Sequence, residues 1–164
     1  MSGLLPSDVE KIALRVVTEN AAIGRRVALA ESCTGGLVCG ALTEVPGSSA
    51  VLDRGFVTYS NESKQELLGV PEDLIETFGA VSPAVAWAMA QGALKHSAAD
   101  VAVAISGIAG PDGGTEMKPV GTVVFACAFR GEEEVNAEQR QLDGKDRAAI
   151  RRQATVVALE LLLP

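Results

Sequence analysis

The sequence predicts an α/β sandwich built on a mixed, mostly parallel sheet. Over the first two thirds of the chain, short apolar segments typical of buried strands alternate with segments whose apolar residues recur at helical spacing. That alternation favours a parallel sheet with connecting helices. Near the C-terminus, residues 122–130 and 135–142 read as two strands joined at a turn over 131–133. A closing hairpin of this kind makes the sheet mixed.

The elements of the first half follow from local signals. Ser7 and Glu10 have capping-box spacing and predict a helix that runs from there to about Asn20. A buried strand is expected over 26–31, followed by a helix over 35–44. The next elements are then a strand over 55–59 and two short helices, over 62–68 and 71–78.

The second half has clearer signals. Ser82 and Pro83 mark a helix start, with the serine as cap and the proline in the first turn. Residues 101–106 are the clearest buried strand, and a glycine-containing loop follows over 107–121. The last helix is expected over 146–163, since apolar residues recur on one of its faces.

Composition limits the class of protein. A chain of 164 residues fits one domain over 1–164, and its 48% hydrophobic content excludes a disordered chain. With 4% aromatic residues, the core must consist mostly of Ala, Val, Leu and Ile. The net charge is −7, and no basic run extends beyond Arg25-Arg26 and Arg151-Arg152. We therefore expect no nucleic-acid partner.

Cysteine usage and hydropathy predict a cytoplasmic protein. Cys33, Cys39 and Cys127 are odd in number and form no Cys-x-x-Cys motif, which indicates neither a disulfide framework nor a zinc site. The N-terminus lacks the pattern of a secretory signal, and no apolar stretch is long enough to span a membrane. No membrane partner is expected.

Small residues are concentrated between the first strand and its helix, over 30–36. Ligands of open α/β sheets bind at the carboxyl ends of strands, and a helix N-terminus offers free N–H groups there. Ser32 is thus a candidate nucleophile beside donors for an oxyanion. An ordinary N-cap serine followed by a glycine turn explains the same residues equally well.

The loop over 107–121 is the second candidate. A structureless segment of this length is uncommon inside a small domain, and its glycines let the backbone approach a ligand closely. The loop has neither the Gly-Lys-Ser/Thr of a phosphate-binding loop nor a Gly-x-Gly-x-x-Gly pattern. A mobile surface loop is the alternative.

A serine nucleophile needs a base. The only histidine, His96, is expected at a helix end, which disfavours a Ser-His-Asp triad. Lys64 can serve if desolvation lowers its pKa, and Tyr59 could relay a proton or orient the amine. A solvated helix lysine and a strand-end aromatic are the alternatives. Cys33 is a second candidate nucleophile, weakened by the missing histidine. Acidic residues show no metal-ligand spacing, so no metal is expected.

Four ordered motifs then resemble one known family. They are AESCTGG over 30–36, GFVTYSNESK over 55–64, GAVS over 79–82 and SGIAGPDGGTEMKPVGTV over 106–123. Together they resemble the CinA C-terminal domain family, whose stand-alone members are nicotinamide-nucleotide amidases. The resemblance runs from the first helix through residues 151–154. It implies a three-layer α/β/α sandwich with about five strands.

The resemblance also implies an activity. A family member of this type deamidates nicotinamide mononucleotide to nicotinate mononucleotide and ammonia, in pyridine nucleotide (NAD) salvage. Carried onto this chain, it implies Ser32 as nucleophile, Lys64 as base and Tyr59 as relay or orienting group, without metal or cofactor. The alternative is a non-catalytic nucleotide- or partner-binding module linked to competence and DNA damage.

Further residues are expected at the substrate. The N–H groups of Thr34 and Gly35, with Cys33 as a further candidate, would bind the oxyanion. The loop from Ser106 to Gly114, including Gly107 and Gly110, would hold the ribose phosphate through its N–H groups, and Asn61 and Thr122 would also contact substrate. Arg147, Arg151 and Lys118 could supply positive potential, although a solvated helix face is the favoured interpretation of the two arginines. The apolar helix stripes allow a homodimer.

Overall fold

A computed structural model describes residues 3–164 and, of Val135, the backbone alone. In chain order its elements are α1 (Ser7–Ala22), β1 (Val27–Glu31), α2 (Leu37–Thr43), the short 3₁₀ helix η1 (Ser48–Ala50), β2 (Leu52–Val57), α3 (Asn61–Leu68), α4 (Glu72–Phe78), α5 (Pro83–Lys95), β3 (Val101–Gly107), β4 (Thr122–Phe129), β5 (Val135–Gln141) and α6 (Arg147–Leu161). None of the helices in this described part is long and apolar enough to cross a membrane.

The strands form one five-stranded sheet in the order β2-β1-β3-β4-β5. β1 runs parallel to both of its neighbours, whereas β4 is antiparallel to β3 and to β5. Four of the five strands therefore point the same way, and the predicted mixed, mostly parallel sheet is confirmed. Because β1, β2 and β3 are parallel, their carboxyl ends meet at one edge of the sheet.

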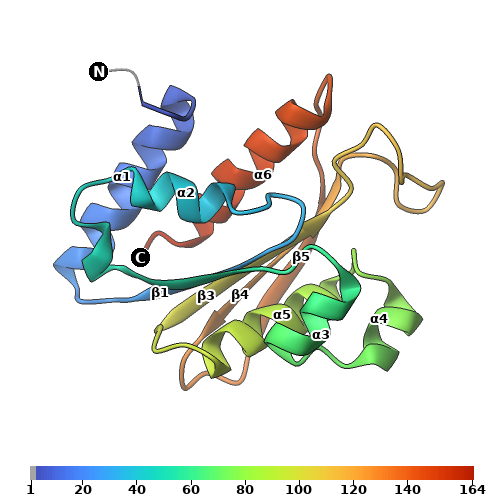
Figure 1. The fold of residues 1–164 in the computed structure, drawn as a ribbon, viewed down its shortest axis with the longest axis horizontal. Helices are drawn as coiled ribbons and strands as arrows, with labels where there is room; N and C mark the ends of the chain where they lie inside the picture. The colour runs from blue at the N-terminus through green and yellow to red at the C-terminus, as the bar shows by residue number, and fades with distance from the viewer. Residues whose placement is uncertain (1–2) are drawn as a thin grey trace.

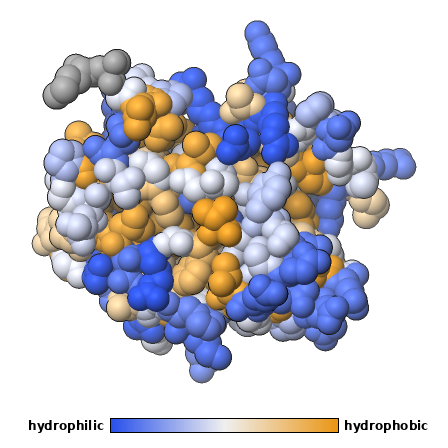
Figure 2. Space-filling view, viewed as in Figure 1, coloured by the Kyte–Doolittle hydropathy of each residue, from blue (hydrophilic) through white to orange (hydrophobic). Residues whose placement is uncertain are grey.

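Helices cover both faces of the sheet, which confirms the three layers. Figure 1 shows α1, α2 and α6 on one face and α3, α4 and α5 on the other. Each face has its own hydrophobic core. In the same view, Figure 2 shows apolar side chains gathered in the middle of the molecule, with polar side chains around the rim.

Small side chains let α5 lie close to the sheet. The face of the sheet toward α5 carries a set of fully buried or nearly buried alanines, namely Ala28, Ala30, Ala102, Ala104, Ala126 and Ala128. α3 also lies close to α5, because a Cβ added at Gly92 would be 2.0 Å from the carbonyl oxygen of Leu68. This close packing agrees with a core poor in aromatic residues.

Two local predictions differ from the structure. The capping box at Ser7 is wrong, because the helix is preceded by Pro6 and no side chain caps it; Ser7 is already its first residue. The predicted strand over 55–59 is instead Leu52–Val57, so Tyr59 lies beyond the strand. This segment is an edge strand with charged residues, and its pairing with β1 outweighs its weak local pattern. By contrast, Ser82 caps α5 as predicted, accepting from the Val85 N–H.

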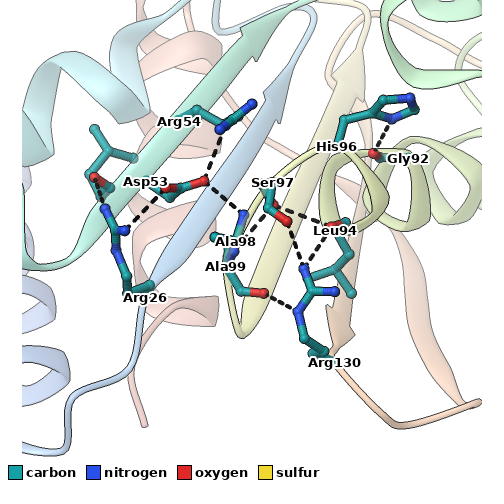
Figure 3. A network of polar contacts seen from close by, with 11 residues as sticks. Arg26, Asp53, Arg54, Gly92, Leu94, His96, Ser97, Ala98, Ala99 and Arg130 are labelled. Atoms are coloured by element: carbon teal, nitrogen blue, oxygen red, sulfur yellow. Dashed lines mark hydrogen bonds and ion pairs between the residues drawn. The ribbon is translucent and has the colours of Figure 1, made fainter.

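Polar contacts close the opposite end of the sheet, before β3 begins (Figure 3). The Arg130 guanidinium donates to the carbonyls of Leu94, Ser97 and Ala99 at 2.7, 3.0 and 2.7 Å. His96 lies here, at the C-cap of α5, with Nδ1 2.8 Å from the Gly92 oxygen. The only histidine therefore sits at the end of the sheet away from the carboxyl ends of the parallel strands.

Candidate active site

The carboxyl ends of β1, β2 and β3 bring three separate segments together. Ser32 follows β1, and its N–H donates to the Ile105 carbonyl of β3 at 2.9 Å. Thr58 follows β2, and its N–H donates to the Glu31 carbonyl at 2.9 Å. These bonds continue the pairing of the strands past their ends, so that Ser32 and residues 58–61 lie beside the end of β3 at Gly107. This is the edge where open α/β sheets bind ligands.

A serine and a lysine meet at this edge. Lys64 Nζ lies 3.0 Å from Ser32 Oγ, 2.8 Å from the Thr58 oxygen and 3.3 Å from the Tyr59 oxygen. Ser60 caps α3 by accepting from the Ser63 N–H, which starts the helix so that Lys64 falls within its first turn. The Lys64 side chain is only 1% exposed.

Burial changes the chemistry of this amine. Desolvation lowers the pKa of Lys64 below its usual 10.5, against the weaker opposing effects of Cys33 and Glu62. An uncharged amine has two N–H donors and one lone pair. Lys64 Nζ donates to Ser32 Oγ in this structure; in the uncharged amine, with its two N–H groups on the carbonyls of Thr58 and Tyr59, the lone pair would face that oxygen. The arrangement can therefore accept the proton of the serine hydroxyl.

The turn that carries Ser32 needs glycine. Gly35 and Gly36 have φ of +60° and +103°, a region that L side chains rarely adopt. The Gly35 N–H donates to the Ser32 carbonyl at 3.0 Å, so the prediction that it is a free oxyanion donor is wrong. The N–H groups of Cys33 and Thr34 donate to no acceptor within residues 3–164. They are the backbone donors next to Ser32 that have no acceptor in this described part of the chain, although Thr34 itself is fully buried.

A buried carboxylate occupies the start of α2. Glu31 is fully buried and accepts from the N–H groups of Gly36, Val38 and Cys39 at 3.2, 3.0 and 3.1 Å. The helix N-terminus is thus already bound to an anion of the protein, and the expectation that it offers free N–H groups is wrong. Glu31 was considered in the sequence only as an acidic residue without metal-ligand spacing, although an acidic residue just before a glycine turn and a helix is a known stabilising arrangement.

A cavity of about 280 Å³ opens beside the Ser32–Lys64 pair. Of the residues predicted to act or bind there, it is lined by Ser32, Cys33, Tyr59, Asn61, Lys64 and Gly107. Ala109, within the predicted phosphate loop, and Arg147, named as a source of positive potential, also line it, together with Ala80 and Val81, which had no predicted role. A Cβ at Gly107 would lie 2.8 Å from Val123 Cγ2 and 3.1 Å from Cys33 Sγ, so this wall requires glycine.

Five of the predicted binding residues do not line this cavity: Thr34 and Gly35 of the nucleophile turn, and Ser106, Gly110 and Thr122 farther along the chain. Ser106 Oγ donates to the Ala80 carbonyl at 2.9 Å and so fixes a residue that lines the cavity. Thr122 Oγ1 donates to the Pro119 carbonyl at 2.6 Å and secures the end of the loop. Gly110 accepts from Arg147 Nη1 at 2.8 Å. In this structure these residues support the site without lining it.

Tyr59 contacts Lys64 through its backbone rather than its phenol. Its carbonyl accepts from Lys64 Nζ, whereas its hydroxyl is 3.0 Å from Arg147 Nη2 and its side chain is 62% exposed. The expected placement of the phenol beside the amine is therefore not what the structure shows.

The two arginines of α6 contact the site, although Arg147 is exposed and Arg151 is only half-buried. They are spaced four residues apart, which places both on one side of the helix. Arg147 reaches Tyr59 and Gly110, and Arg151 donates to the carbonyls of Cys33 and Thr34 at 3.0 and 3.1 Å. In the sequence, only the spacing of four residues between these arginines could have indicated that they face the same site. Lys118 is engaged elsewhere, with Nζ donating to the Phe78 carbonyl at 2.8 Å.

Cys33 is poorly suited to act as a nucleophile. It is 5% exposed, and burial raises the pKa of its thiol to about 11. Metal ligation also lacks a basis in the described residues, among which no group of three His, Cys, Asp or Glu side chains could hold an ion. Ser32 is the hydroxyl that contacts a buried amine.

These features define an α/β sandwich protein with a serine–lysine pair at the carboxyl edge of its parallel strands. A family model described as the CinA C-terminal domain matches residues 9–164. The chain therefore belongs to the CinA C-terminal domain family, as the motifs predicted.

Similar proteins carry two kinds of name. The nicotinamide-nucleotide amidohydrolase PncC of Escherichia coli K12 is 56% identical over 140 residues, which are 85% of this chain and 83% of that protein. A CinA-like protein of Akkermansia muciniphila is 53% identical over 84% of this chain, which spans only 33% of that longer relative. The crystal structure of the competence/damage inducible protein CihA from Agrobacterium tumefaciens superposes with a TM-score of 0.94 at 49% identity, covering 99% of this chain and 97% of that one.

Proposed function

We propose that this protein is a nicotinamide-nucleotide amidase, a single domain over 1–164 that hydrolyses the carboxamide of nicotinamide mononucleotide in pyridine nucleotide salvage. The observation that carries the proposal is the 3.0 Å contact between Lys64 Nζ and Ser32 Oγ beside a cavity. The name of the similar E. coli protein supports the choice of substrate. Ammonia and nicotinate mononucleotide are the products.

The first half of the reaction transfers the acyl group to Ser32. Neutral Lys64 takes the hydroxyl proton as Oγ attacks the carboxamide carbon, and a tetrahedral oxyanion forms. The N–H groups of Thr34 and Cys33 donate to that oxyanion. The protonated lysine then gives its proton to the amide nitrogen, the C–N bond breaks, and ammonia leaves an ester on Ser32.

The second half returns the serine. Water attacks the ester carbon while Lys64 takes a proton from it, and a second tetrahedral oxyanion forms at the same donors. Collapse breaks the bond between carbon and Oγ, and Ser32 recovers its proton from Lys64. The carboxylic acid group so formed loses its remaining proton to solvent, and the nicotinate product leaves as a carboxylate. Lys64 must be uncharged at the start of both halves, which the lowering of its pKa by burial favours.

Binding of the nucleotide needs local positive charge, because the protein carries a net charge of −7. Arg147 lines the cavity and is the guanidinium best placed for a phosphate. Backbone N–H groups near Gly107 and Ala109, which line the cavity, complete the proposed contacts to ribose and phosphate together with Asn61. Tyr59, whose hydroxyl bonds to Arg147, orients that guanidinium.

The test measures ammonia and nicotinate mononucleotide formed from nicotinamide mononucleotide by the wild type, Ser32→Ala, Lys64→Ala and a control, Lys11→Ala, at an exposed lysine of α1. The wild type and the control should turn over equally, while both site variants lose turnover and keep their far-UV circular dichroism. A folded wild type that binds the nucleotide in a thermal-shift assay but releases no ammonia would favour the binding-module alternative.

A further inference from the structure

Arg151 is connected to the backbone of the nucleophile turn rather than to another side chain. It projects from α6, and its Nε and Nη2 donate to the carbonyls of Cys33 and Thr34 at 3.0 and 3.1 Å. The next residue, Arg152, behaves differently, since it forms an exposed ion pair with Asp8 at 2.7 Å. One arginine therefore holds two successive carbonyls beside Ser32, and its neighbour makes only a surface contact.

The geometry of the peptide bond extends this contact to the N–H groups. In a trans peptide the carbonyl and the N–H point in opposite directions. The bond from Arg151 to the Cys33 carbonyl thus turns the Thr34 N–H away from Arg151. The bond to the Thr34 carbonyl fixes the next N–H, that of Gly35, which donates to the Ser32 carbonyl. The Ser32 carbonyl accepts this bond from inside the turn, so the Cys33 N–H, which belongs to the same peptide unit, points away from the inside of the turn.

We propose that Arg151 is a positioning residue for the oxyanion site: it fixes and polarises the peptide units whose free N–H groups, at Thr34 and Cys33, receive the oxyanion. The inference rests on the proposed amidase function. A charged donor on a carbonyl withdraws electron density from its peptide and strengthens the N–H of that peptide as a donor. The charge of Arg151 does reach this turn, since it opposes the effect of burial on the pKa of the Cys33 thiol.

The surroundings of Arg151 allow this role to be tested without unfolding the protein. Arg151 and Arg152 both line a groove of about 430 Å³ between the start of α1, the start of α2 and α6, with Leu37 and Thr155 in its wall. Truncation of either side chain would enlarge a groove that is open to water rather than leave a void in a core. The two neighbouring arginines are therefore a matched pair for substitution.

The variants are Arg151→Met, Arg151→Lys and the control Arg152→Met. For nicotinamide mononucleotide we expect Arg151→Met to lower kcat roughly tenfold to a hundredfold, below the loss of about 10²–10³ for a deleted oxyanion donor, with KM nearly unchanged. Arg151→Lys should fall between Met and wild type, because an ammonium lacks the planar fork that serves two carbonyls. Arg152→Met should keep the wild-type kcat.

Two further readouts separate positioning from loss of structure. A pyridine-3-boronic acid, which forms a tetrahedral adduct with the serine, should bind Arg151→Met more weakly in proportion to kcat/KM, while nicotinate mononucleotide binds equally well. The acid limb of the pH profile should stay in place, since Arg151 is not among the groups that shift the pKa of Lys64. Titration of active serines with a fluorophosphonate should count the same number of sites as in wild type.

The outcomes distinguish the two claims. A wild type with no turnover would overturn the amidase and this inference with it. A wild type that turns over, beside an Arg151→Met variant with unchanged kcat, fewer titratable serines or a shifted acid limb, would overturn the role of Arg151 and leave the amidase standing.

Discussion

Glu31 should make a large contribution to both stability and activity, although it sits directly before the nucleophile. Its carboxylate accepts three backbone N–H groups from the start of α2 and has no exposed surface. In Glu31→Ala these three donors lose their acceptor, and each buried donor left unpaired costs about 1–3 kcal/mol. The substitution also removes the cost of burying a charged group, which offsets part of the loss from the three unpaired donors. We therefore expect a net loss of about 3–5 kcal/mol in the free energy of unfolding.

The isosteric variant refines the prediction. In Glu31→Gln the amide oxygen can keep the bonds to Gly36 and Val38, while the NH₂ group faces the N–H of Cys39. One bond is lost and two donors oppose each other, for a cost of about 1–3 kcal/mol. Turnover of nicotinamide mononucleotide should fall in both variants, because the turn carrying Ser32 leads into α2.

Urea unfolding followed by far-UV circular dichroism measures these differences, with Glu66→Ala, at an exposed position of α3, as the control. The control should lie within about 0.5 kcal/mol of wild type. A Glu31→Ala variant as stable as that control, or a Gln variant less stable than the Ala variant, would refute the reasoning.

Three further predictions concern the same site. The kcat/KM of the enzyme should rise with pH through the lowered pKa of Lys64, because only the neutral amine accepts the serine proton. The unfolded chain keeps the usual, higher pKa of lysine, so the free energy of unfolding should also rise with pH between the lowered pKa of Lys64 and 10.5. Absence of this rise in stability in Lys64→Met checks the assignment to Lys64. Cys33→Ala should keep most of the turnover. Iodoacetamide at neutral pH should react slowly with Cys33, because the pKa of its thiol is raised to about 11. Rapid alkylation of Cys33, detected by intact-mass analysis and matched by loss of activity, would argue against this. Gly107→Ala should lower the free energy of unfolding by about 1–3 kcal/mol and raise KM, because its Cβ would meet Val123 and Cys33. The control is Gly40→Ala in α2, where a Cβ meets nothing within 4 Å. Thermal unfolding should show this control to be neutral or stabilising.

Elements with strong local signals could be predicted from the sequence. The apolar run that forms β3 and the Ser82-Pro83 start of α5 occur where expected, because each depends on residues close together in the chain. β2 was misplaced, since an edge strand that contains Asp53, Arg54 and Gly55 is held by pairing with β1 rather than by its own pattern. Hydrophobic periodicity predicted the fold class alone, whereas the four motifs predicted the family.

The site depended more on contacts distant in sequence. Ser32 and Lys64 were found by motif, but their contact arises from the parallel register of β1 and β2, which no local signal fixes. The contacts of Arg147 with Tyr59 and of Arg151 with Cys33 cross 88 and 118 residues of chain, so a helix pattern alone could not separate them from solvated arginines. The Tyr59 phenol was misplaced for the same reason, because Arg147 binds its hydroxyl.

The position of the covalent intermediate shows directly which side chain is the nucleophile. Wild-type protein mixed with nicotinamide mononucleotide would be acid-quenched within milliseconds and examined by fragment mass spectrometry. We predict a nicotinoyl-nucleotide ester on Ser32 Oγ, formed with release of ammonia and absent from Ser32→Ala and Lys64→Ala. An adduct on Cys33, or undiminished product formation by Ser32→Ala, would contradict this prediction.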